Sequence, residues 1–219
     1  PADFAGAVEA ILQTKGRVIV SGVGKSGHIG NKIAATLAST GTPASFVHAT
    51  EANHGDLGMV TAADFCLLIS NSGETSELRD IVGHTRRFGI PMAAISSKPH
   101  STLMQAADYK LALTAAPEAC SIGMAPTTST TLTLALGDAL AVALMERRDF
   151  QPEDFKVFHP GGKLGAQMAT VAQLMHHGDA LPIVDHKTPM QDALITMTSK
   201  GFGIAVVIQE GALLGVITD

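Results

Sequence analysis

Two loops in the sequence combine residue types that suit the binding of a phosphate group. The first reads SNSGETSE at positions 70–77 and follows the continuous apolar segment 65–69. Its hydroxyl groups, together with the free N–H groups of a helix that begins after it, can hold a phosphate dianion through many neutral donors. A helix cap alone would account for one hydroxyl and one acid. The loop therefore predicts a phosphate site.

The second loop reads GVGKSG at positions 22–27, between an expected strand and an expected helix. Its glycines let the backbone approach an anion, and the start of the helix supplies N–H groups and a positive dipole. The spacing also matches the dinucleotide-binding pattern, but Glu51 is a poor match for the acid expected about 20 residues later. A P-loop is excluded because position 19 is Ile and not Gly. A plain glycine turn is the alternative to a phosphate site.

The order of expected elements places both loops at one edge of a sheet. Short apolar strands are expected at 17–21, 44–48, 65–70, 91–96 and 110–113. Helices are expected at 3–15, 26–39, 75–88, 101–107 and 127–148, and they alternate with the strands. This alternation predicts an α/β fold with a mostly parallel sheet and helices on both faces. The carboxyl ends of such strands are where these sheets bind ligands.

The expected helix at 127–148 is apolar on almost every side. Its longest apolar stretch, 132–145, is interrupted by Gly137 and Asp138 and is shorter than the roughly 20 residues that span a bilayer. We therefore expect no membrane association. A helix of this kind is buried on several sides, and part of that burial is expected against another subunit of a homo-oligomer.

Composition narrows the class of protein. The chain has 219 residues, 46% of them hydrophobic and 16% charged, which indicates a packed globular protein. The net charge of −5 and the lack of a Lys/Arg cluster argue against a nucleic-acid partner. Two cysteines, Cys66 and Cys120, form no disulfide framework and favour a reduced cytoplasmic location.

The stretches SGVGKSGHIG and SNSGETSE together resemble the SIS (sugar isomerase) domain family. The resemblance implies a three-layer α/β/α domain with a parallel sheet in flavodoxin-like order. In that family the serine–threonine loop holds the phosphate of a sugar phosphate. By this resemblance the phosphate-binding residues are Ser70, Asn71, Ser72 and Thr75, with Ser26 assisting.

Longer stretches resemble one family among SIS proteins, the arabinose-5-phosphate isomerases. They include VGKSGHIGNKIAATLASTGTPASFVHATEANHGDLGM, PEACSIGMAPTTSTT, GDALAVALM and FHPGGKLG. Members interconvert arabinose 5-phosphate and ribulose 5-phosphate through an enediol, for 3-deoxy-octulosonate and for lipopolysaccharide or capsule biosynthesis. The resemblance implies a homotetramer that requires no cofactor and no metal.

The same resemblance divides the chain into two domains. Residues 1–165 correspond to the SIS domain, and residues 166–219, with VAQLMHHGDALPIV and GVITD, resemble the first of a pair of CBS modules. The second module is not in this sequence. A nucleotide ligand between paired CBS modules is therefore expected only for a full-length protein.

An aldose–ketose isomerase needs a base, a second acid and a cation or hydrogen-bond donor near the reacting carbons. The matching positions supply Lys25, His54, Glu77, Glu118 and His159. We predict Glu118 as the enediol base, because its loop, 115–125, gives a carboxylate no capping role; a solvated loop acid is the alternative. Lys25 suits stabilisation of the enediolate or phosphate, since a lysine at a helix start is otherwise unfavourable.

His159 in FHPGG suits ring opening or proton transfer, and in related SIS enzymes such a histidine can come from a neighbouring subunit. An unremarkable turn residue is the alternative. Glu77 can equally be a first-turn acid of its helix. His54 lies near His48 in a metal-like cluster, but its spacing is not a recognised zinc pattern, so only an adventitious metal is expected there.

Three rival functions follow from single features of the sequence. A SIS sensor would bind a sugar phosphate without chemistry, usually beside a helix-turn-helix, and no basic helix-turn-helix is recognisable here. A dinucleotide-dependent oxidoreductase would use the glycine loop but has no use for SNSGETS. A purely regulatory CBS protein would need more than the fragment at 166–219.

Overall fold

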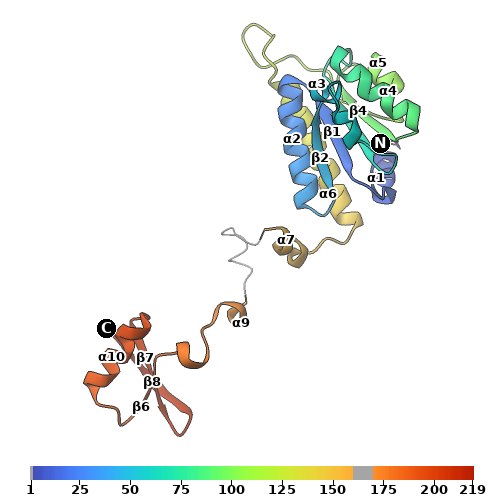
Figure 1. Ribbon diagram of the computed structural model, residues 1–219. Helices are drawn as coiled ribbons and strands as arrows, with labels where there is room; N and C mark the ends of the chain where they lie inside the picture. The colour runs from blue at the N-terminus through green and yellow to red at the C-terminus, as the bar shows by residue number, and fades with distance from the viewer. Residues whose placement is uncertain (1, 160–169) are drawn as a thin grey trace. The chain divides into compact units, whose positions relative to one another are not determined.

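The computed structural model describes residues 2–159 and 170–219. The chain forms two compact units, Pro1–Gly165 and Ala166–Asp219, which are described separately (Figure 1). The first unit contains a five-stranded sheet in the order β2-β1-β3-β4-β5, and every neighbouring pair is parallel. The strands are β1 Val18–Gly22, β2 Ala44–His48, β3 Phe65–Ile69, β4 Met92–Ser96 and β5 Tyr109–Ala112. The parallel sheet and its flavodoxin-like order are confirmed.

Successive side chains of each buried strand point to opposite faces of this sheet, and each face packs on its own helices. Val18 and Val20 of β1 lie in a core with the helices α1 Ala2–Gln13, α2 Gly24–Ser39 and α6 Thr128–Arg147. Ile19 lies in the other core, with α3 Ala49–Ala52, α4 Arg79–Phe88 and α5 Thr102–Ala106. The two cores make a three-layer α/β/α domain (Figure 1).

Several short elements were not expected from the sequence. They are α3, the 3-10 turn η1 Asp56–Met59, and α7 Pro152–Phe158, while the helix expected at 75–88 begins with a 3-10 turn, η2 Ser76–Leu78. Elements of three or four residues have no hydrophobic period to detect. The helix α7 has a detectable start, because Gln151 and Asp154 form a capping box around Pro152.

The helix α6 buries one stripe, formed by Ser129, Thr133, Gly137, Leu140, Ala141 and Leu144. An added Cβ at Gly137 would lie 2.4 Å from Ile33, so α2 and α6 approach closely there. Val142, on another side, is 51% exposed. The expectation that 132–145 is too short for a membrane concerned only part of this helix, which has 20 residues. Among the described residues it alone is long and apolar enough, by length and composition only, to cross one.

The second unit has a β-α-β-β order. Its elements are α9 Val171–Leu174, η3 Gly178–Ala180, β6 Ile183–Asp185, α10 Met190–Lys200, β7 Ile204–Gln209 and β8 Ala212–Thr218. β6 pairs with β7 in parallel, and β7 pairs with β8 antiparallel. Val184, Ala193, Met197 and Ala205 form its small core. Large apolar side chains remain exposed within this unit, among them Ile195 at 66% and Leu213 at 68%.

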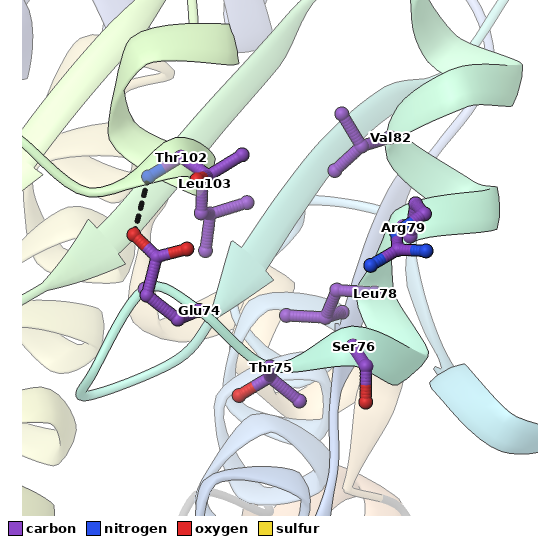
Figure 2. A pocket seen from close by; sticks show the side chains of 9 residues that line it. Glu74, Thr75, Ser76, Leu78, Arg79, Val82, Thr102 and Leu103 are labelled. Carbon is purple, nitrogen blue, oxygen red and sulfur yellow. Dashed lines mark hydrogen bonds between the residues drawn. The ribbon is translucent and has the colours of Figure 1, made fainter.

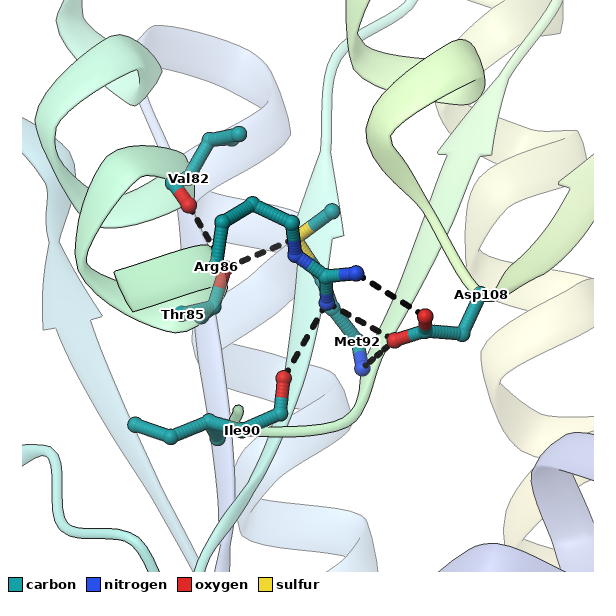
Figure 3. A network of polar contacts seen from close by, with 6 residues as sticks. All are labelled: Val82, Thr85, Arg86, Ile90, Met92 and Asp108. Atoms are coloured by element: carbon teal, nitrogen blue, oxygen red, sulfur yellow. Dashed lines mark hydrogen bonds and ion pairs between the residues drawn. The ribbon is translucent and has the colours of Figure 1, made fainter. Parts of the chain in front are cut away.

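A polar clamp joins α4 to the strands β4 and β5 on the outer part of the sheet (Figure 3). Arg86 donates two hydrogen bonds to the carboxylate of Asp108, at 2.9 and 2.7 Å, and a third to the carbonyl of Ile90. Asp108 also accepts from the amide of Met92 at 2.8 Å. The hydrogen bonds from Arg86 are the main cause that lowers the pKa of Asp108.

We predict that Asp108→Asn destabilises the first unit by about 1 kcal/mol, because the pair is partly exposed and screened by solvent. The pKa of Asp108 is lowered in the folded state. The stabilisation is therefore present above the unfolded pKa of about 3.9 and is lost as pH falls through the folded value. Urea unfolding at pH 7 and at pH 3 should show a difference between wild type and variant that shrinks in acid. Glu9→Gln, which breaks an exposed ion pair with Arg147, should have a smaller effect. If both variants lose the same free energy of unfolding, Asp108 contributes no more to stability than an exposed ion pair does.

Candidate active site

A cavity of about 330 Å³ lies where the carboxyl ends of β1 and β3 meet the start of α6. This is the point at which strand order reverses in a flavodoxin-like sheet, the usual ligand position of such folds. Its lining contains every residue predicted to bind phosphate. The full lining is Val23, Lys25, Ser26, Ile29, Ser70, Asn71, Ser72, Thr75, Pro126, Ser129, Thr130 and Thr133.

The loop after β3 curls so that its hydroxyl groups converge. Ser70, which is 2% exposed, lies with its Oγ 2.7 Å from Oγ1 of Thr75 and 3.4 Å from Oγ of Ser72. The Ser70 hydroxyl also accepts from the amide of Gly73 at 2.9 Å. Gly73 has φ +68°, which favours glycine. The result is a cup of neutral donors that suits a phosphate.

The same loop also contacts the start of α5 (Figure 2). Glu74 accepts a hydrogen bond from the amide of Thr102, the first residue of α5, at 2.8 Å. That bond is the largest cause that lowers the pKa of Glu74. The amide of Leu103 donates to the carbonyl of Gly73 at 3.0 Å. A smaller cavity of about 160 Å³ separates this part of the loop from Arg79 and Val82 on α4.

The start of α2 closes the opposite side of the phosphate cup. Val23 precedes the helix and makes no side-chain cap, so the first N–H groups of α2 are available to a ligand. Lys25 is exposed in the first turn, and both it and Ser26 line the cavity. A cation beside the hydroxyl cup complements the charge of a phosphate or an enediolate.

A second cavity of about 230 Å³ adjoins the first, and the two share Asn71 and Ser129 in their linings. Glu118 lines this second cavity together with Lys98 and Leu113. The phosphate cup and the predicted base therefore line two adjoining cavities. This separation suits a substrate that has its phosphate at one end and its reacting carbons at the other.

The carboxylate of Glu118 caps the start of α6. It accepts hydrogen bonds from the amides of Thr127 at 2.7 Å and Ser129 at 3.2 Å, and from the Thr127 hydroxyl at 3.1 Å. The expectation that this carboxylate has no capping role is wrong, because the loop folds back on the helix that follows it. The pKa of Glu118 is lowered to about 2, first by the nearby Ser129 hydroxyl and then by the Thr127 amide. The Ser129 hydroxyl itself makes no hydrogen bond of good geometry.

Further contacts close the loop between Glu118 and α6. The Thr127 hydroxyl accepts from the amide of Ala119 at 2.9 Å. The Cys120 thiol accepts from the amides of Met124 and Ala125 at 3.2 and 3.1 Å, and these hydrogen bonds lower its pKa. Neither Thr127 nor Ser129 was predicted from the sequence to have a role in the site. The TTSTT run at the start of a helix was the signal that could have found them.

Glu77 and His54 do not line either of these two cavities. Glu77 lies in η2 and accepts from the Ser76 hydroxyl at 2.8 Å. Its pKa is lowered by its own amide first, then by Ser76, and least by the charge of His48. His48 ends β2 and accepts from the Thr50 amide, whereas His54 lies in the exposed turn after α3. Within residues 2–159 and 170–219, no three His, Cys, Asp or Glu side chains gather as metal ligands.

His159 lies at the other end of the sheet within the same chain. Its ring stacks on Phe155 at 3.8 Å, and its Nδ1 lies 2.9 Å from the carbonyl oxygen of Phe155. The helix α7 contacts Phe150, which packs beside Gly41 at the end of α2. The 20 residues of α6 separate this end from Glu118 by roughly 30 Å. The rest of the FHPGG stretch lies outside the described residues.

Comparison with known proteins identifies the family of this chain. The family model described as SIS domain matches residues 11–143. A curated relative, Arabinose 5-phosphate isomerase KdsD of Pseudomonas aeruginosa, is 51% identical over 99% of this chain and 67% of its own length. The protein of the same name from Escherichia coli K12 is 48% identical over the same shares.

A solved structure from Escherichia coli CFT073, in complex with A5P, matches with a TM-score of 0.70 and 43% identity. It covers 73% of this chain, and 85% of that chain is matched. The chain therefore belongs to the SIS domain family and, within it, to the arabinose 5-phosphate isomerases.

Proposed function

We propose that this chain interconverts D-arabinose 5-phosphate and D-ribulose 5-phosphate. The observation that carries the proposal is the hydroxyl cup of Ser70, Ser72 and Thr75, which opens beside the cavity that contains Glu118. The family relatives named above carry the same activity in their names. Arabinose 5-phosphate made by this reaction in the cytoplasm would supply the synthesis of 3-deoxy-octulosonate for lipopolysaccharide or capsule.

The reaction moves one proton between C1 and C2 of the open-chain sugar. Glu118 removes the proton from C2 of the aldose and returns it to C1, while the proton on O2 leaves and O1 gains one, so no atom is lost. Lys25 stabilises the negative charge that develops on the enediolate or on the phosphate. Glu77 and His54 have supporting roles in this proposal, and no cofactor or metal takes part.

We propose that the complete site needs a second subunit. His159 cannot approach Glu118 of its own chain, because α6 lies between them. A homotetramer in which His159 reaches the site of a neighbour would place it for ring opening or proton transfer. The exposed side of α6, with Val142 at 51%, is apolar and suits such an interface.

We also propose that residues 166–219 are the first CBS module of a longer protein. The β-α-β-β order and the exposed Ile195 and Leu213 support this, because a paired module would cover apolar surface. In a full-length protein the pair would bind a nucleotide. The rival function, a sugar-phosphate sensor, would use the hydroxyl cup but would not need Glu118.

The test is turnover of arabinose 5-phosphate to ribulose 5-phosphate, measured with and without EDTA. We expect turnover that EDTA does not reduce, since no step uses a metal. Saturable binding of the sugar phosphate without turnover would support the sensor instead. Loss of turnover on adding EDTA, with recovery on adding zinc, would mean that the His48–His54 segment binds a required metal.

A further inference from the structure

Ser129 is a buried hydroxyl that lies at the junction of the two site cavities. It is 9% exposed, and it lines both the phosphate cavity and the cavity that contains Glu118. Its Oγ makes no hydrogen bond of good geometry in the part of the chain that the structure describes, although it lies near the Glu118 carboxylate and is the largest cause of that group's lowered pKa. A buried polar atom without a partner is costly and calls for an explanation.

Two neighbouring hydroxyls on α6 show that Ser129 differs from its surroundings. Thr130 donates to the carbonyl of Thr127 at 2.8 Å, and Thr133 donates to the carbonyl of Ser129 at 2.8 Å. Both line the same cavity, yet both are satisfied within their helix. The Ser129 amide is also used, since it donates to Glu118. Only its side-chain oxygen is left without an aligned partner, and the residue is part of the lining of both cavities.

Other unpaired buried hydroxyls do not share this position. Ser21, Thr42 and Ser101 lack partners too, but none of them lines either site cavity. Thr42 lies in the turn after α2, at the amino edge of the sheet. The combination of burial, a free hydroxyl and a place in both linings is therefore particular to Ser129 among these four.

We propose that the Ser129 hydroxyl binds a hydroxyl group in the middle of the sugar chain, on C3 or C4, and so selects the substrate. The inference rests on the proposed function. An open-chain pentose 5-phosphate that places its phosphate in the cup and its C1 and C2 near Glu118 must pass Ser129 with these middle carbons. The hydroxyl groups on C3 and C4 take no part in the proton transfer between C1 and C2. A contact with one of them therefore affects substrate selection and positioning.

The test pairs deletion of the enzyme hydroxyl with deletion of the substrate hydroxyl. Wild type and Ser129→Ala are compared on arabinose 5-phosphate and on its 3-deoxy and 4-deoxy analogues. We expect wild type to lose about 10-fold or more in kcat/KM on one analogue. Ser129→Ala should lose a similar factor on the natural sugar and should treat that analogue and the natural sugar nearly alike.

Thr42→Val is the matched control, because it also removes an unpaired buried hydroxyl. It should keep the preference of wild type for the natural sugar over the analogues. Ser129→Ala should stay folded and unfold at a temperature only slightly below wild type, because the hydroxyl makes no aligned hydrogen bond and only its effect on the Glu118 carboxylate is lost. The inhibition constant for inorganic phosphate should be unchanged, because the cup stays intact.

An unchanged penalty for both analogues in Ser129→Ala would overturn the inference. So would a shift in the acid side of the kcat/KM profile with no change in preference, which would mean that the hydroxyl acts only through Glu118. If wild type shows no turnover, the proposed function fails first. The same four comparisons can then be made as dissociation constants by calorimetry, and equal penalties there would also overturn the role of Ser129.

Discussion

Glu118→Gln is expected to lower kcat for arabinose 5-phosphate by about 10²–10⁴-fold, the range of a positioned general base. The amide keeps the size of the side chain, and its oxygen can still accept from Thr127 and Ser129. The phosphate cup is separate, so KM and the inhibition by inorganic phosphate should change little. Steady-state kinetics with both ligands measure this. A loss confined to KM would mean that Glu118 only shapes the cavity.

The pH dependence of the same reaction tests how the base is activated. The pKa of Glu118 is about 2 in the free chain, so the group is ionised above about pH 3 and cannot limit kcat/KM there. A carboxylate with so low a pKa is a weak proton acceptor. We therefore expect substrate binding to weaken the cap bonds and to raise this pKa. The acid side of the kcat profile, which reports the complex, should then lie at higher pH than that of kcat/KM.

Mixing inactive subunits checks whether the site is shared. Glu118→Gln and His159→Asn should each be nearly inactive alone as assembled oligomers. Co-assembled in equal amounts, they should recover up to about a quarter of wild-type activity if each site takes Glu118 from one subunit and His159 from another. If confirmed mixed oligomers recover no activity, one site does not take Glu118 from one subunit and His159 from another.

The sheet and its cup were predictable because local patterns define both. Continuous apolar strands such as 65–69 and the glycine and serine loops that follow them depend on neighbours in sequence. The parallel topology then brings Ser26 and Ser70 to the same edge. None of this required knowledge of a distant contact.

The surroundings of Glu118 were not predictable, because they depend on how a loop folds back. Nothing in the sequence shows that Thr127 and Ser129 return their amides to a carboxylate about ten residues earlier. The same holds for His159, whose distance from the cup follows from the direction of α6 and not from any motif. Short turns such as η2, which holds Glu77, also lack a period that a sequence can reveal.

Gly73→Ala is expected to damage both stability and phosphate binding. An ideal Cβ at this position would lie 1.9 Å from Oγ and 2.3 Å from Cβ of Ser101, and 3.0 Å from Oγ of Ser96. The backbone φ of +68° adds strain of about 1–2 kcal/mol. Overpacking adds about 1–3 kcal/mol. Relief of the clash would move the amide that donates to Ser70 and open the cup, so the inhibition constant of inorganic phosphate should rise about 10-fold or more.

Gly89→Ala separates the strain from the clash. Gly89 has φ +64° at the end of α4, and nothing lies within 4 Å of its added Cβ. Urea unfolding should show a loss of only about 1 kcal/mol there, with phosphate inhibition and kcat unchanged. If Gly73→Ala does not fold, the double variant Gly73→Ala/Ser101→Gly removes the two closest clashing atoms and should recover folding. Equal stability and phosphate affinity in Gly73→Ala and Gly89→Ala would show that contact with α5 does not shape the cup.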